Sequence, residues 1–180
     1  AAATRFEKVQ ASLPPLQEPL KLPQPTASLA VEGVTVVVPG SQRVVMSQAS
    51  FTLSAGQVLA VIGPSAAGKS SLARAITGIW TPARGAVRLD GAALDRWSIE
   101  NLGRSIGYLP QDVQLFDGTI SENIARFEDN PDAERVLAAA EAACVHQMVL
   151  KLPSGYETQI GEGGESLSAG QRQRVALARA

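Results

Sequence analysis

The sequence is poor in cysteine, has no long apolar run and carries almost no net charge. Its one cysteine, Cys144, excludes an internal disulfide framework and agrees with a reducing compartment. Because Cys144 lies in an alanine-rich helical pattern, we expect it to be a small core residue rather than a reactive thiol. A formal net charge of −1 does not support bulk electrostatic binding, so no nucleic-acid partner is expected.

No stretch approaches the roughly 20 consecutive apolar residues that a membrane-spanning helix needs, and no secretory signal opens the chain. The printed chain is therefore expected to be soluble by itself. With 180 residues, 45% of them hydrophobic, it is long enough to form one domain with a sizeable core.

The first 27 residues differ in composition from the remainder. Apolar residues at helical spacing in 1–13 are interpreted as the end of a helix. Residues 14–25 hold five of the eleven prolines. Proline removes N–H donors and favours extended chain, so 14–27 is interpreted as a linker and 28–180 as the globular part.

The segment around which the chain is organised begins at Val58. Five apolar residues, 58–62, predict a strand buried on both faces, as in a parallel sheet. The motif G-x-x-x-x-G-K-[ST] follows at 63–70. A helical pattern comes next and ends at Thr77-Gly78, with four residues predicted on its apolar face: Leu72, Ala73, Ile76 and Ile79.

Strand, glycine-bounded loop and helix are the context in which this motif binds phosphate. Such a loop turns its backbone N–H groups inward, and the helix adds its first N–H groups and the positive end of its dipole. Lys69 is expected to reach the β- and γ-phosphates of a nucleotide, and Ser70 to offer its hydroxyl to Mg²⁺. The alternative is a simple strand-to-helix turn with a surface lysine. The predicted phosphate-binding residues are Gly63, Pro64, Ser65, Ala66, Ala67, Gly68, Lys69, Ser70 and Ser71.

Before the loop, β-branched residues predict two strands, at 29–38 and 43–53, joined by a turn at 39–41. After it, a short strand is expected at 85–91, ending in an Asp-Gly turn. A polar helical piece around 98–102 and a strand at 105–109 follow. The early strands are expected to form an antiparallel layer.

From Asp112 the pattern turns helical. Thr119 to Glu122 has the form of a capping box, and a helix is expected to start at Asn130-Pro131. Residues 161–165 are interpreted as a flexible acidic loop, and a last helix opens at Ser168. The apolar faces of the first two helices are expected to carry Ile120, Ile124 and Phe127, and Val136, Leu137 and Ala140.

Four patterns in order resemble those of ATP-binding cassette (ABC) ATPases. Residues 167–171 resemble the family's Leu-Ser-Gly-Gly-Gln signature and lie about 100 residues after the loop, as in that family. Tyr108-Leu109-Pro110-Gln111 resembles its Q-loop, 115–124 the exporter form of the next segment, and 161–164 the exporter X-loop. The signature positions here are Leu167, Ser168, Ala169, Gly170 and Gln171.

The resemblance implies an α/β P-loop NTPase fold with an antiparallel β layer and a helical subdomain over about 112–180, truncated before the Walker B strand. It implies ATP and Mg²⁺ as cofactors, with Lys69 and Gln111 catalytic and with Ser70 and Gln111 at the metal. In the family the signature serine serves the ATP of a second cassette in a head-to-tail homodimer, so Ser168 is expected to do so. The alternatives are a simple N-cap for Ser168, paired with Gln171 in a capping box, and an exposed loop glutamine for Gln111.

Among exporters, the linker and residues 36–40 look most like type I protein-secretion ATPases of Gram-negative bacteria. This implies a parent at the cytoplasmic face of the bacterial inner membrane, where ATP binding and hydrolysis drive transport. In such proteins a six-helix transmembrane domain precedes the cassette, so the parent's own transmembrane domain is an expected partner. The resemblance also implies membrane-fusion and outer-membrane secretion proteins as partners. The alternatives are a nucleotide-binding module without catalysis and a soluble ABC ATPase of repair or translation.

The sequence departs from the family pattern at several positions. Ala66 and Ala169 stand where the family commonly has glycine, and 36–39 lacks the usual aromatic ring for adenine. His146 precedes the signature, whereas the family's switch histidine follows it, so we interpret His146 as a helix residue without a catalytic role. The resemblance implies that the parent hydrolyses ATP. The family's Walker B Asp, catalytic Glu and switch His are not among the printed residues, so we expect this chain alone to be marginally stable and to hydrolyse little or no ATP.

Overall fold

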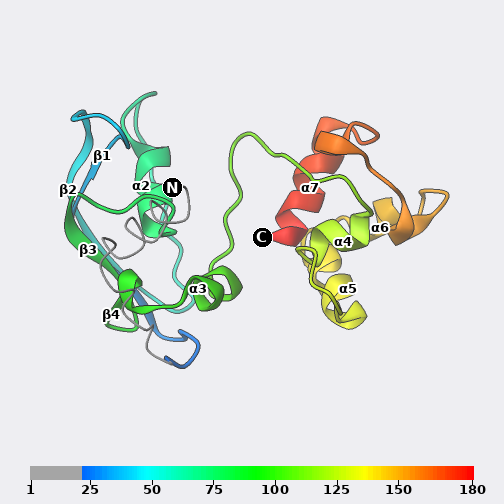
Figure 1. Cartoon of the computed structure of the whole chain (residues 1–180), viewed down its shortest axis with the longest axis horizontal. Helices are drawn as coiled ribbons and strands as arrows, with labels where there is room; N and C mark the ends of the chain where they lie inside the picture. The colour runs from blue at the N-terminus through cyan, green and yellow to red at the C-terminus, as the bar shows by residue number, and fades with distance from the viewer. Residues whose placement is uncertain (1–21) are drawn as a thin grey trace, which may run out of the picture. The chain divides into compact units, whose positions relative to one another are not determined.

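The structure, a computed structural model, describes residues 22–180 and divides into two compact units. One unit ends at Ser105 and the other runs from Ile106 to Ala180 (Figure 1). The helix interpreted at 1–13 and the linker up to residue 21 lie outside the described residues. The remainder of the linker, 22–27, forms no helix or strand, and the first strand starts at residue 28.

The first unit is built on an antiparallel sheet with the strand order β2-β1-β3-β4. β1 (Ser28–Val37) pairs with β2 (Val44–Ser54) on one side and with β3 (Arg84–Leu89) on the other, and β3 pairs with β4 (Ala92–Ala93). The predicted strands before the loop, the short strand after it and the antiparallel layer are therefore confirmed.

The predicted Asp-Gly turn joins β3 to β4. Asp90 and Gly91 both have left-handed backbone angles, with φ of 48° and 81°, as a tight two-residue hairpin requires. The Asp90 carboxylate accepts the N–H groups of Thr26 at 2.7 Å, Ala27 at 2.9 Å and Ser28 at 2.6 Å. This side chain therefore fastens the start of β1 to the far end of β3.

One face of the sheet packs against α2 (Lys69–Ile76). Val34 and Val36 alternate onto that face, and the irregularity between Val31 and Val34 brings Val31 onto the same face, so that all three are buried. They form the core of the first unit with Val87 of β3 and with Leu72 and Ala75 of α2. The helix ends at Ile76, and Gly78 follows with φ of 77°, so the predicted stop is confirmed. Ile79 was predicted on the apolar face, but it lies beyond the helix and is 55% exposed.

The predicted strand at 58–62 does not form. These residues carry no regular structure, and Val58 and Ile62 are 94% and 91% exposed. A parallel strand exists only through ladder bonds to its neighbours, and none of the strands described in 22–180 pairs with this segment. The predicted strand at 105–109 is also wrong. Ser105 is the last residue of α3 (Ile99–Ser105), and residues 106–110 pair with no strand in the described part of the chain.

The second unit is helical. It contains α4 (Ile120–Ile124), α5 (Ala133–Ala142), α6 (His146–Val149) and α7 (Ala169–Arg179). Short 3₁₀ turns are η2 (Gly155–Glu157) and η3 (Glu162–Gly164), and the first unit contains one more, η1 (Leu94–Arg96). The core of the second unit gathers apolar residues from all four helices, including Ile124, Val136, Val149 and Val175.

The predicted capping box opens α4. The Glu122 N–H donates to the Thr119 hydroxyl at 3.0 Å, and the Thr119 N–H donates to the Glu122 carboxylate at 2.7 Å. Behind it, the fully buried Asn123 side chain accepts the Phe116 N–H and donates to the carbonyls of Phe116 and Thr119, each within 3.0 Å. This amide ties the segment before α4 to the helix.

Several predictions about the second unit are wrong. Regular helix starts at Ile120 rather than near Asp112. Phe127 and Leu137 are 43% and 39% exposed; Phe127 lies beyond α4, and Leu137 lies away from the buried Val136 face. Cys144 is exposed, because α5 ends at Ala142 and the cysteine sits in the following turn with φ of 53°.

Residues 161–165, interpreted as a flexible loop, form the η3 turn. Gly164 is buried there, and a Cβ on it would come within 3.1 Å of the Leu115 side chain. Across 22–180, none of the helices is both long enough and apolar enough to cross a membrane.

Candidate functional site

The glycine-bounded loop ends in a left-handed residue at the start of α2. Gly68 is the N-cap, with φ of 87°, and Ala66 two residues earlier has φ of 63°. Within the loop the Ala67 N–H donates to the Pro64 carbonyl at 3.3 Å. These angles turn the chain sharply, so the loop leads directly into the N-terminus of a helix whose first N–H groups have no partners within it.

Gly68 is required for packing as well as for conformation. A Cβ at this position would collide with the Val45 carbonyl oxygen and would lie 3.1 Å from the Val45 carbonyl carbon. The loop therefore rests against the backbone of β2, and a side chain at residue 68 would push the two apart.

The Lys69 ammonium lies back over the loop. It donates to the Gly63 carbonyl at 2.8 Å and to the Pro64 carbonyl at 2.7 Å. Its positive charge is thus held by the loop itself, at the end of α2 where the helix dipole is also positive. Together these groups make a site suited to an anion.

A cavity of about 230 Å³ opens beside the loop. Residues 66–71 line one side, and Arg43, which directly precedes β2, and Val45 of β2 line the other. Two cations, Lys69 and Arg43, therefore face a cavity whose described lining contains no carboxylate. Sequence reasoning missed Arg43; its one signal was its position just after the turn at 39–41.

Mg²⁺ keeps several waters and takes oxygen ligands. Among the described residues that line this cavity, Ser70 and Ser71 carry side-chain oxygens, which are their hydroxyl groups. No group of three or more His, Cys, Asp or Glu side chains in 22–180 is placed to hold a metal ion. This lining fits a hydrated Mg²⁺ that is held partly by a bound phosphate and partly by Ser70.

The residues at 167–171 start α7 in the second unit. The Ser168 N–H donates to the Gln171 side chain at 2.7 Å, and the Gln171 N–H donates to the Ser168 hydroxyl at 3.4 Å. The capping box considered from the sequence is therefore formed. Ser168, Ala169 and Gly170 are exposed, whereas Leu167 is buried and anchors the helix start in the core.

Gln111 is exposed and lies outside any helix or strand, in the second unit. The structure thus brings residues 63–71 together in the first unit, and residues 167–171 together in the second. His146 is the first residue of α6, and its Nδ1 lies 2.9 Å from the Tyr156 hydroxyl. Both side chains are half-buried, and burial, and then the charge of Glu141, raise the pKa of Tyr156.

The family model, the curated relatives and the solved structure that match this chain all point to one family. The ABC transporter family matches residues 46–180. The type I secretion system ATP-binding protein PrsD of Rhizobium meliloti is 57% identical over 176 residues, which are 98% of this chain and 30% of that protein. The ATP-dependent lipid A-core flippase of Haemophilus influenzae is 38% identical over 154 residues, 85% of this chain and 26% of the flippase.

Among solved structures, a bacterial Atm1-family ABC exporter with ATP bound matches with a TM-score of 0.82 and 33% identity. The match covers 99% of this chain and 32% of the exporter chain. The chain therefore spans about a third or less of the length of these relatives. The glycine-bounded loop at 63–70, the capped start of α7 and these matches agree: the chain belongs to the ABC transporter family and is part of an exporter-type ATP-binding domain.

Proposed function

We propose that residues 63–71 bind the phosphates of MgATP, and that the full-length protein uses ATP binding and hydrolysis to drive export. The observation that carries the proposal is the formed loop, in which Lys69 is held over the start of α2 by two loop carbonyls. A γ-phosphate would replace those carbonyls as the acceptor of the Lys69 ammonium. The exchange is favourable because a charge-assisted hydrogen bond is stronger than one to a neutral carbonyl.

Each remaining residue has a role that its chemistry supports. The backbone N–H groups of 66–71 face the phosphates, and the Ser70 hydroxyl contacts Mg²⁺. When bound, Mg²⁺ would neutralise the charge that develops on the phosphate oxygens. Gln111 would help to hold the metal and to position the attacking water. Lys69 and Gln111 are the proposed catalytic residues.

Ser168 is proposed to act on the ATP of a second cassette in a head-to-tail homodimer. Its hydroxyl oxygen accepts the Gln171 N–H, so its own proton stays available for a γ-phosphate. The exposed residues 169 and 170 of the helix start would add N–H groups that face the same anion. The helix cap and the ligand contact are thus compatible.

The proposed export is type I protein secretion. Support comes from the 57% identity to a protein named for that system, which exceeds the 38% identity to the lipid A-core flippase. The partners would be the protein's own transmembrane domain and the membrane-fusion and outer-membrane proteins of the secretion system. The site of action would be the cytoplasmic face of the bacterial inner membrane.

We further infer that the printed chain, tested alone, binds nucleotide without appreciable turnover. Phosphoryl transfer requires a positioned metal and a positioned nucleophile. In the described lining of the loop cavity, no carboxylate is present to hold the metal or accept a proton. A turnover number for the printed chain equal to that of the full-length protein would contradict this inference.

The test of nucleotide binding is calorimetric titration of MgATP into the full-length protein and into two variants. Lys69→Ala removes the cation of the loop, and Lys151→Ala removes an exposed lysine of the second unit as a matched control. We expect saturable binding that is lost in Lys69→Ala and kept in Lys151→Ala. Equal affinity in the wild type and Lys69→Ala would exclude the loop as the phosphate site.

A further inference from the structure

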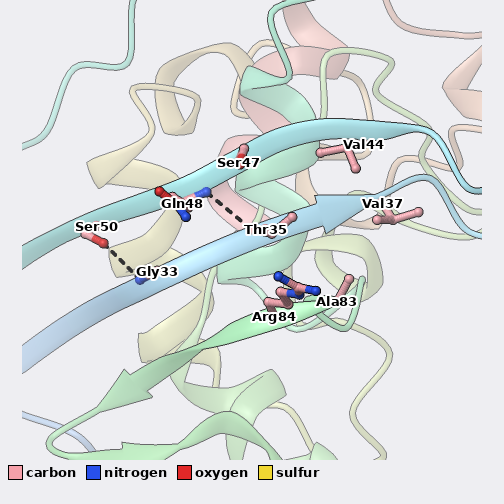
Figure 2. Close-up of a pocket in the computed structure, with 9 residues that line it drawn as sticks. All are labelled: Gly33, Thr35, Val37, Val44, Ser47, Gln48, Ser50, Ala83 and Arg84. Carbon is pink, nitrogen blue, oxygen red and sulfur yellow. Dashed lines mark hydrogen bonds between the residues drawn. The ribbon is translucent and has the colours of Figure 1, made fainter.

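Two facing β-bulges hollow the side of the sheet that points away from α2. On β1, the bulge includes Gly33 with φ of 58°, and on β2 it includes Gln48 with φ of 52°. A bulge bends its strand and increases the local twist. The result is a cavity of about 590 Å³ over β1, β2 and the start of β3 (Figure 2). This volume lies within the range of small-molecule sites, which is about 300–1,000 Å³.

The polar groups around this outer hollow are arranged as donors. The Ser50 hydroxyl accepts the Gly33 N–H at 2.9 Å, and the Thr35 hydroxyl accepts the Gln48 N–H at 3.3 Å (Figure 2). Each of these hydroxyl protons is therefore free to donate to a ligand. The Ser47 hydroxyl also lines the hollow, and nothing in the described part of the chain bonds to it. The lining thus offers several O–H donors.

Arg84 supplies the positive charge of the outer hollow. It lies directly across from Thr35 in the pairing of β1 with β3, and it lines the hollow. Within the described residues, its guanidinium makes no ion pair, and the hollow contains no carboxylate. The acid next to the bulge, Glu32, is already bonded to Arg88 at 2.8 Å. Arg84 is therefore an uncompensated cation beside a cluster of hydroxyl donors.

The remainder of the hollow is apolar, because Val37, Val44 and Ala83 line its other part. We propose that the outer hollow binds a small organic anion, with the carboxylate or phosphate on Arg84 and the hydroxyls of Thr35 and Ser47. The apolar body of that ligand rests on Val37 and Val44. The guanidinium fork matches both kinds of oxyanion, since each presents two oxygens to it. This site is separate from the phosphate-binding loop and does not depend on the function proposed for it.

The test is calorimetric titration of phenyl phosphate and of benzoate into the full-length protein. Saturating MgATP is present, so that the loop cavity is filled. We expect one saturable site for at least one of the two probes, and their relative affinities identify the preferred oxyanion. Inorganic phosphate is expected to bind more weakly than phenyl phosphate, because it has no apolar body.

Variants assign the binding to the outer hollow. Arg84→Ala is expected to weaken binding at least about tenfold, which corresponds to about 1.4 kcal/mol. Arg84→Lys is expected to be intermediate, because lysine keeps the charge and loses the fork. Ser47→Ala, at an exposed residue without structural bonds in the described part, is expected to weaken binding a few-fold. Arg104→Ala is the matched control, because Arg104 is exposed in the same unit and lines none of the cavities described above.

Three results would overturn the proposal. The first is the absence of saturable binding of both probes to the wild type. The second is equal affinity in the wild type, Arg84→Ala and Ser47→Ala. The third is inorganic phosphate binding as tightly as phenyl phosphate, which would contradict the role given to Val37 and Val44.

Discussion

Replacing Gly68 with alanine tests whether the loop geometry depends on this one residue. An L-residue in the left-handed region costs about 1–2 kcal/mol, and Gly68 has φ of 87°. The new Cβ would also displace the Val45 carbonyl, whose carbon would lie 3.1 Å away. We therefore expect Gly68→Ala to lower the free energy of unfolding by at least about 1–2 kcal/mol.

The matched control is Gly103→Ala in α3. Gly103 has no positive φ, and a Cβ there would meet nothing within 4 Å. In a helix, alanine is more stable than glycine by about 0.5–1 kcal/mol, so this variant is expected to gain stability. Urea unfolding compares the two variants, and calorimetry with MgATP shows whether Gly68→Ala also weakens binding. An unfolding free energy for Gly68→Ala at or above that of the wild type would refute the reasoning.

Two further predictions concern single side chains that hold segments in place. Asn123→Leu would remove the partner of the Phe116 N–H and of the Phe116 carbonyl, whereas the Thr119 carbonyl would keep its bond from the backbone N–H of residue 123, so we expect a loss of about 2–4 kcal/mol in urea unfolding, with the exposed Asn130→Leu as a near-neutral control. The N–H bonds from Thr26 and Ser28 lower the pKa of Asp90 below its ordinary value near 3.9. The stability that Asp90 contributes is therefore present above the unfolded-state pKa and is lost as pH falls through the lower folded-state pKa. Asp90→Asn should accordingly unfold more easily at pH 7 and show a shallower loss of stability towards pH 3, and parallel pH profiles for the two proteins would contradict this.

The parts of the fold that the sequence predicted are those with local causes. β1 and β2 follow from β-branched residues on either side of a short turn, and the turn at Asp90 follows from its residue types. The starts of α4 and α7 follow from capping boxes whose partners are three residues apart. In each case the interacting groups are close in sequence, so the local pattern of residue types is enough to predict the turn or the helix start.

The failures have non-local causes. Residues 58–62 have the composition of a buried strand, but a strand requires partners, and in 22–180 no strand pairs with them. Cys144 follows two residues after the end of α5, and its exposure depends on where that helix stops. Arg43 reaches the loop cavity only because β2 packs beside α2, which no local pattern reveals.

The motif at 63–70 was sufficient to predict the position of Lys69 at a helix start, and the structure adds the two carbonyls that hold it. The roles of Gln111 and Ser168 remain predictions, because they concern bound ATP and a second cassette. Sequence pattern could select these residues, but their function depends on groups brought by other molecules.

The beginning of β2 is shared between two cavities on opposite faces of the sheet. Arg43 and Val45 line the cavity beside the glycine-bounded loop, whereas Val44 and Ser47 line the outer hollow. A ligand that shifts this stretch from one side necessarily changes the surface offered on the other. By thermodynamic linkage, any coupling free energy between the two occupants is reciprocal: whatever factor the outer ligand imposes on nucleotide affinity, the nucleotide imposes on the outer ligand. Movement of β2 would then couple the binding of the two ligands.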